Sequence, residues 1–197
     1  MAYTAAPPLL PVFRSHLQGE VLALVLGDPA VEWTVEDLAR RTGHPRQTVA
    51  NEIRRLEGAA LVLAQTIGRT KLLRANAANP YFEPLARLAL MSFGPPLVIQ
   101  EEFGRLHSVE QVFIYGSWAA RYAGEQGPAP HDVDVLVIGS PDRDEMYDAA
   151  RRTEERLGRE VNTTIRTAEQ WETAQDGFTR QLRSSPRVEI PIGGAGT

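Results

Sequence analysis

The sequence predicts an α+β protein. Three observations lead to this class: apolar residues at helical spacing over residues 15–57, two β-prone runs over residues 61–75, and strand-like runs alternating with helices after residue 108. With 197 residues, the chain is long enough for one large domain or two small ones. The change of pattern along the chain favours two.

The first predicted elements are three helices whose ends are marked by local signals. Residues 15–27 show apolar positions at helical spacing followed by a glycine. Thr34 begins the second helix, because an acidic residue three positions later fits a capping box, and Gly43 ends it. Pro45 suits the first turn of a third helix over residues 45–57.

The third helix and the segment after it concentrate positive charge. The polar and basic side chains of this helix are Arg46, Gln47, Thr48, Asn51, Arg54 and Arg55. A β-hairpin is predicted next, with Arg69 at its turn and Lys71 and Arg74 on its return strand. Residues 40–74 carry a net charge of +6 in a chain whose net charge is −4. This contrast predicts polyanion binding at that stretch alone.

Helices followed by a basic hairpin in residues 1–78 resemble the winged helix-turn-helix of bacterial transcription regulators. The resemblance implies binding of double-stranded DNA. The third helix would contact base edges in the major groove, while Arg69, Lys71 and Arg74 would contact backbone phosphates. The alternative is that the charged helix serves protein contacts on the same fold.

Residues 79–107 predict a helical linker. Gly94-Pro95-Pro96 divides it into two helices, because proline lacks a backbone donor and restricts the residue before it. The apolar residues of its first helix are Phe82, Leu85, Leu88, Ala89 and Phe93. They fit either a dimer seam or packing between the two domains, and we expect a homodimer.

Residues 108–197 contain a pattern that predicts phosphate and metal binding. A strand ends at Gly116-Ser117 and leads into a helix, whose free amides favour phosphate. Asp132 and Asp134 open a later apolar strand and project to the same side, because alternate strand residues do so. Their carboxylates repel each other unless a cation joins them, and Mg²⁺ binds one or two carboxylates together with substrate phosphates.

Gly116-Ser117 followed by Asp132 and Asp134 resembles the signature of the polymerase-β-like nucleotidyltransferases, especially their small bacterial members. The resemblance implies an α/β domain that transfers a nucleoside monophosphate from a nucleoside triphosphate. Gly116 and Ser117 would bind the triphosphate, and the catalytic Asp132 and Asp134 would hold Mg²⁺ (or Mn²⁺). The loop between the two motifs is longer here than in those small members.

The resemblance also implies a third carboxylate on the next strand, where this sequence has Asn162. Asparagine is neutral and cannot act as a base. Glu160, two residues earlier on the same face, is either a solvated charge at the start of the strand or an alternative third ligand. Three functions therefore stay open: a DNA-binding regulator that senses Mg-nucleotide with weak or no catalysis, an active enzyme, and a catalytically dead dimerisation scaffold. The active enzyme would modify a protein partner, as antitoxin-type enzymes do, or a small molecule.

The composition limits the remaining classes of site and location. The chain has no cysteine, so disulfides and thiolate metal sites are excluded. No apolar run reaches the roughly 20 residues of a membrane span, and the N-terminus does not fit a signal peptide. We expect a cytoplasmic protein with no membrane association.

Overall fold

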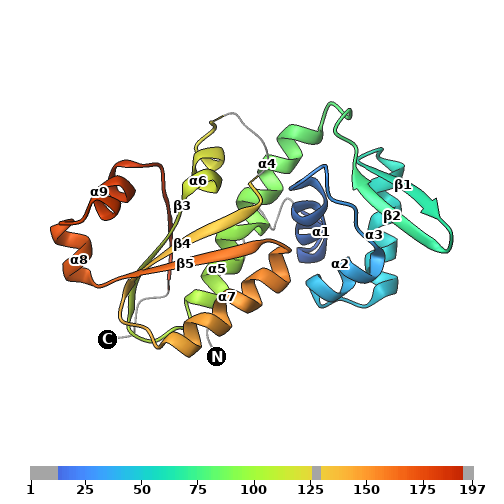
Figure 1. The fold of residues 1–197 in the computed structure, drawn as a ribbon. Helices are drawn as coiled ribbons and strands as arrows, with labels where there is room; N and C mark the ends of the chain where they lie inside the picture. The colour runs from blue at the N-terminus through green and yellow to red at the C-terminus, as the bar shows by residue number, and fades with distance from the viewer. Residues whose placement is uncertain (1–12, 126–129, 193–197) are drawn as a thin grey trace. The chain divides into compact units, whose positions relative to one another are not determined.

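The computed structural model describes residues 13–125 and 130–192 and has an α+β fold (Figure 1). The chain forms two compact units, Met1–Gly94 and Pro95–Thr197. The boundary falls at the break predicted from glycine and proline. The two helices predicted as a linker over residues 79–107 are therefore divided, one to each unit. Within the described ranges, no helix combines the length and apolar character that crossing a membrane requires.

In its described residues, 13–94, the first unit has four helices and one two-stranded antiparallel sheet. They are α1 (His16–Leu26), α2 (Val35–Thr42), α3 (Arg46–Gly58), β1 (Val62–Ile67), β2 (Thr70–Ala75) and α4 (Phe82–Phe93). The local signals at the ends of α2 are confirmed. Thr34 and Asp37 form a capping box, and Gly43 ends the helix in the left-handed conformation with φ of 67°.

Helix α4 packs along α1 within the first unit. Phe93 is buried, and its ring meets the rings of Phe13 and His16 edge-on. Ala89 is also fully buried, whereas Leu88 is 44% exposed. Two of the five apolar residues considered for a dimer seam are therefore buried inside their own unit.

The second unit is built on a four-stranded sheet in the order β5-β4-β3-β6. Its strands are β3 (Val109–Tyr115), β4 (Asp132–Gly139), β5 (Glu160–Arg166) and β6 (Val188–Ile190). β4 and β5 are parallel, whereas β3 is antiparallel to both of its neighbours. The helices are α5 (Pro95–Phe103), α6 (Gly116–Tyr122), α7 (Arg143–Leu157), α8 (Ala168–Thr173) and α9 (Gly177–Ser184).

The two faces of this sheet are buried in separate cores, because side chains alternate along each strand. Val133, Val135 and Val137 of β4 belong to the larger core, which includes residues of α5, α6 and α7. Leu136 and Ile138 belong to a smaller core with Leu182 of α9. Asp132 and Asp134 are an even number of positions from Leu136 and Ile138 on β4, so all four side chains point to the same face of the sheet. The two carboxylates therefore lie on the face of the smaller core.

Trp118 and Tyr122 of α6 belong to the larger core. Trp118 is buried, and Tyr122 packs against the same cluster with a ring-centroid distance of 5.3 Å between the two. Both side chains therefore contribute to core packing.

Candidate functional site

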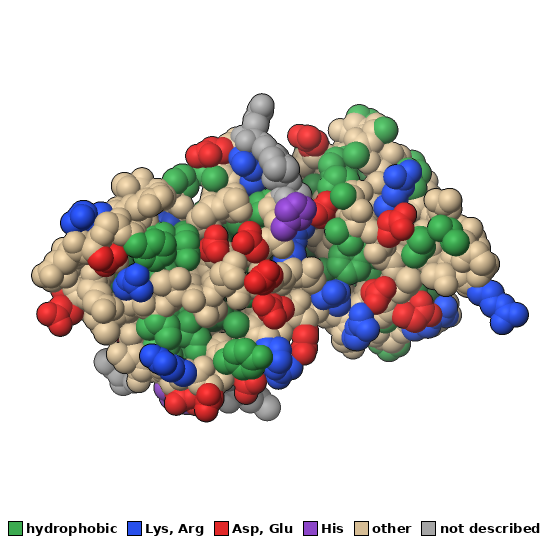
Figure 2. All heavy atoms as spheres, viewed as in Figure 1, with side chains coloured by type: hydrophobic (Ala, Val, Ile, Leu, Met, Phe, Trp, Pro, Cys, Tyr) green, Lys and Arg blue, Asp and Glu red, His purple; other side chains and the backbone are tan. Residues whose placement is uncertain are grey.

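The predicted phosphate and metal residues meet at one end of the sheet. β4 and β5 both begin there, and the antiparallel strand β3 ends there. The register sets Asp134 beside Tyr115 on one side and beside Asn162 on the other. Figure 2 shows acidic side chains gathered over this part of the second unit. We call the following residues the acidic edge: Gly116, Ser117, Asp132, Asp134 and Asn162.

Gly116 lies directly against the carboxylate of Asp134. Its φ is +70°, a conformation that side-chain-bearing residues rarely adopt. A Cβ atom added at this position would lie 2.3 Å from Oδ2 of Asp134. Glycine therefore allows the bend after β3 to approach the carboxylate, and Ser117 follows as an exposed residue. α6, which begins at this bend, spans only seven residues.

Asn162 connects the two carboxylates. Its Nδ2 donates to Oδ2 of Asp132 at 3.1 Å and to Oδ1 of Asp134 at 3.3 Å. The position where a third carboxylate was expected thus holds a neutral donor. One amide group stabilises a pair of like charges that would otherwise repel.

The electrostatics of the pair favour an added positive charge. Burial raises the pKa of Asp134 above its ordinary value, and the charge of Asp132 raises it further, while the Asn162 hydrogen bond opposes both effects. Neither aspartate forms an ion pair with any residue in the described ranges. Asp132 and Asp134 therefore lack the basic partner that partly buried carboxylates usually have.

The donor set fits one hard divalent cation. The described part of the chain contains no group of three or more His, Cys, Asp or Glu side chains able to hold a metal. Glu160 is in register with Asp132 but is exposed and completes no such group. Two carboxylates remain, together with Oδ1 of Asn162, which accepts no hydrogen bond from described residues. Oxygen ligands of this kind suit Mg²⁺ when phosphates and water complete its coordination.

Tyr115 belongs to the site but was not predicted from the sequence. Its hydroxyl lies 3.1 Å from Oγ1 of Thr164 on β5, and its ring meets Phe178 edge-on. Phe178 is 43% exposed. Strand alternation could have indicated its position. Tyr115 is two positions after Phe113 on β3, so both side chains lie on the sheet face of the smaller core. An aromatic surface thus lies next to the acidic edge.

Arg121 was also missed. It lies one helical turn after Ser117 on α6, so both residues share one face of the helix. Its Nε and Nη1 atoms are buried and have no hydrogen-bond partner among the described residues. The spacing of four residues was a signal available in the sequence. Arg121 supplies a cation one helical turn from Ser117, and no carboxylate of the described residues forms an ion pair with it.

The predicted DNA-binding residues form an exposed surface on the first unit. Every one of them is exposed: Arg46, Gln47, Thr48, Asn51, Arg54, Arg55, Arg69 and Lys71.

Ion pairs divide the basic residues of this surface into two groups. Arg46 pairs with Glu36, Arg55 with Glu52 at 3.2 Å, and Lys71 with Glu57 at 2.7 Å. By contrast, three arginines of α3 and the hairpin form no ion pair with any described residue: Arg54, Arg69 and Arg74. These three present charge that no neighbouring carboxylate offsets.

No protein-family model, curated protein or solved structure matches this chain.

Proposed function

We propose that the chain is a DNA-binding transcriptional regulator whose second unit binds a nucleoside triphosphate with Mg²⁺ or Mn²⁺ and transfers nucleotide weakly or not at all. The observation that carries this proposal is the amide of Asn162 between the carboxylates of Asp132 and Asp134. The acidic edge offers ligands for a cation, but it lacks a third carboxylate.

Nucleotide binding is supported by the chemistry of the acidic edge. Asp132 and Asp134 would hold the cation, with Oδ1 of Asn162 as a neutral ligand. The bound cation would neutralise the carboxylates and bind phosphate oxygens. Gly116 allows close approach of the backbone, and the Ser117 hydroxyl can donate to a phosphate. Arg121 would add positive charge for the same polyphosphate.

Weak catalysis is supported by the identity of residue 162. Nucleotidyl transfer needs a group that takes the proton of the attacking hydroxyl and stabilises the resulting charge. Asn162 can do neither, because its side chain is neutral and cannot be protonated near neutral pH. A site with these residues is therefore suited to binding a nucleotide and signalling its presence.

Calorimetry with a non-hydrolysable triphosphate tests this proposal. Binding is expected with Mg²⁺ and is expected to disappear when EDTA removes the cation. Ser117→Ala should weaken the affinity roughly 10- to 100-fold, because a hydrogen bond to a charged group is worth about 1.5–3 kcal/mol. Ser140→Ala, just past the opposite end of β4, removes the same hydroxyl outside the site and should change nothing. Absence of binding would instead favour the dimerisation scaffold.

DNA binding is supported by the shape and charge of the first unit. Helices α2 and α3 are followed by the β1-β2 hairpin, in the order typical of a winged helix-turn-helix. The exposed side chains of α3 are of the types that read base edges, namely Arg, Gln, Asn and Thr. The unpaired Arg69 and Arg74 suit phosphates, because binding there breaks no ion pair in the described part of the chain.

Arg54→Ala and Arg69→Ala should each weaken binding to double-stranded DNA and lower the slope of log K against log salt by about one. Arg46→Ala should weaken binding less, because Glu36 already offsets that charge. Filter binding or fluorescence anisotropy at several salt concentrations measures this slope. Arg87→Ala, an exposed arginine of α4, is the matched control. A wild-type protein without salt-sensitive DNA binding would contradict the regulator role.

A further inference from the structure

Strand β5 is an edge strand of the four-stranded sheet. Beside it, residues of β5 and α7 line a groove of about 390 Å³. The groove includes Tyr147, whose side chain is 71% exposed, and the exposed Thr163. Edge strands are usually protected because their unpaired backbone groups can bind another strand.

The ends of this edge are occupied by side chains and its centre is open. The Val161 N–H donates to Oε1 of Glu154 at 3.0 Å, and the Ile165 carbonyl accepts from Nη1 of Arg166 at 2.8 Å. These bonds indicate that the odd-numbered residues of β5 turn their backbone groups away from β4. Thr163, between them, has no partner for these groups among the residues described.

We propose that β5 pairs in antiparallel fashion with β5 of a second copy of this chain, with Thr163 at the two-fold axis. In this register, Thr163 of each copy exchanges two hydrogen bonds with its counterpart. Val161 lies opposite Ile165 of the second copy, so the groups now occupied by Glu154 and Arg166 become each other's partners. An axis at residue 162 or 164 would leave one of the three outward-facing residues unpaired.

Helix α7 carries the charge complementarity that favours a second copy over an unrelated peptide. The groove is lined along this helix by Arg143, Tyr147, Ala150 and Glu154. α7 joins the parallel strands β4 and β5 and so runs opposite to both. A two-fold axis near Thr163 then sets Arg143 of one copy against Glu154 of the other.

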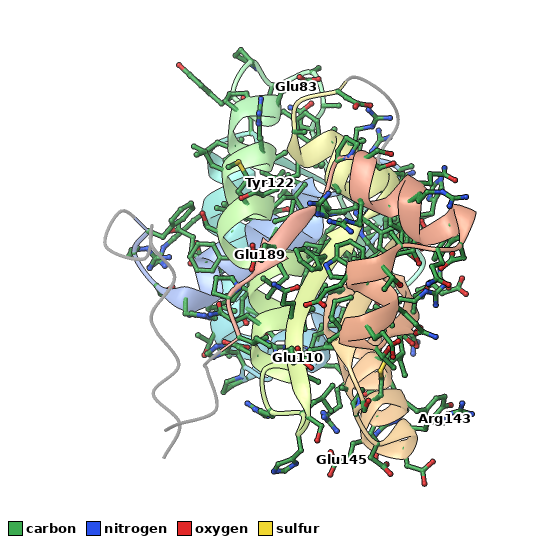
Figure 3. All side chains as sticks on the ribbon, turned by 90° about the vertical axis from the view of Figure 1, so that its left-hand side faces the viewer. Glu83, Glu110, Tyr122, Arg143, Glu145 and Glu189 are labelled. Carbon is green, nitrogen blue, oxygen red and sulfur yellow. The ribbon has the colours of Figure 1, made fainter. Side chains whose placement is uncertain are left out.

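Arg143 is available for such a contact. It is exposed in the first turn of α7, directed away from the sheet (Figure 3), and it forms no ion pair within the described ranges. Near the axis, the small Ala150 allows the two helices to approach, and Tyr147 supplies apolar area. This face of the second unit is therefore self-complementary in backbone register and in charge.

The pairing would also connect the two acidic edges. Asn162 would lie opposite Thr164 of the second copy, as a non-hydrogen-bonded pair with roughly 4.5 Å between Cα atoms. Within each copy, Thr164 already contacts the Tyr115 hydroxyl. The second copy thus contributes a residue next to the Asn162 amide. This inference does not depend on nucleotide binding.

Light scattering of the full chain over a range of concentrations tests the proposal, and a dimer is expected. Thr163→Pro removes the N–H at the axis, and Tyr147→Asp brings two carboxylates together. Each should raise the dimer dissociation constant roughly tenfold or more. Tyr147→Asp keeps the test valid if the proline variant fails to fold. Arg143→Glu should also weaken the dimer, and adding Glu154→Arg should restore it.

Cysteine cross-linking tests the register, since the chain has no cysteine of its own. Thr163→Cys would place two thiols across the axis with Cα atoms roughly 5.5 Å apart, a separation that a disulfide spans. An oxidised dimer is expected, while Ser184→Cys, an exposed position on α9, should stay monomeric on a denaturing gel. A monomeric wild type would overturn the proposal, and an extended peptide would then be the candidate to pair with the edge strand β5. A dimer unaffected by these variants and not cross-linked at 163 would overturn it as well.

Discussion

Asn162→Asp is expected to convert the second unit from binding nucleotide to transferring it. The substitution adds the third carboxylate beside Asp132 and Asp134, at the point where the amide now bonds both. A positioned general base contributes roughly 10²–10⁴-fold to a rate, and we expect an increase of this order. Release of pyrophosphate from a nucleoside triphosphate in the presence of Mg²⁺ measures transfer without knowledge of the acceptor.

The same substitution should weaken the second unit when no cation is present. Two hydrogen bonds are lost and three carboxylates then share one end of the sheet, so the free energy of unfolding should fall by about 1–3 kcal/mol. Mg²⁺ should restore it. Asn162→Ala is the control, because it removes the hydrogen bonds without adding charge and should not raise pyrophosphate release. If Asn162→Asp binds triphosphate but releases no more pyrophosphate than wild type, the role given to residue 162 is wrong.

Asp134→Asn is expected to stabilise the protein without cation and to abolish stabilisation by Mg²⁺ and triphosphate. The pKa of Asp134 is raised above its ordinary value of 3.8, so the folded state binds this proton more tightly than the unfolded state. The contribution of Asp134 to stability is therefore largest at low pH. It falls as pH rises from the ordinary pKa through the folded one, and stays low at neutral pH. In Asp134→Asn no proton is lost at this position. The free energy of unfolding of the variant should therefore depend less on pH between the ordinary and the folded pKa of Asp134.

The ligand-dependent half of this prediction is the larger effect. At a ligand concentration 100 times the dissociation constant, binding stabilises the folded state by about 2.7 kcal/mol. For a unit of this size that raises Tm by roughly 10 °C or more. Thermal unfolding with and without Mg²⁺ and triphosphate should show this shift in wild type but not in Asp134→Asn. Glu160→Gln removes a carboxylate from the same sheet face and should keep the shift. A shift retained in Asp134→Asn would place the cation elsewhere.

The ends of several elements could be predicted because they depend on neighbouring residues. Thr34 and Gly43 mark the ends of α2 as expected. The break at Gly94 also separates the two units. Capping, glycine conformation and proline sterics act within a few residues, so one sequence is enough to recognise them.

The contacts of the acidic edge could be predicted only in part. Alternation along a strand places Asp132 and Asp134 on one side, but the Asn162 bridge depends on the register between β4 and β5. The hydroxyl contact of Tyr115 joins residues 49 positions apart. Register is set by packing of the whole sheet, so a single sequence did not indicate that the amide would donate to both carboxylates.

The close approach of Gly116 to Asp134 makes these two positions a coupled pair in evolution and in mutant libraries. Any side chain at 116 collides with the carboxylate at 134, so the two substitutions should be strongly non-additive. A library randomised at both codons should recover side chains at 116 only where residue 134 has become smaller. Asparagine should then be the commonest substitution at position 116, because it tolerates positive φ better than most other side chains do. Among homologues, the two alignment columns should covary.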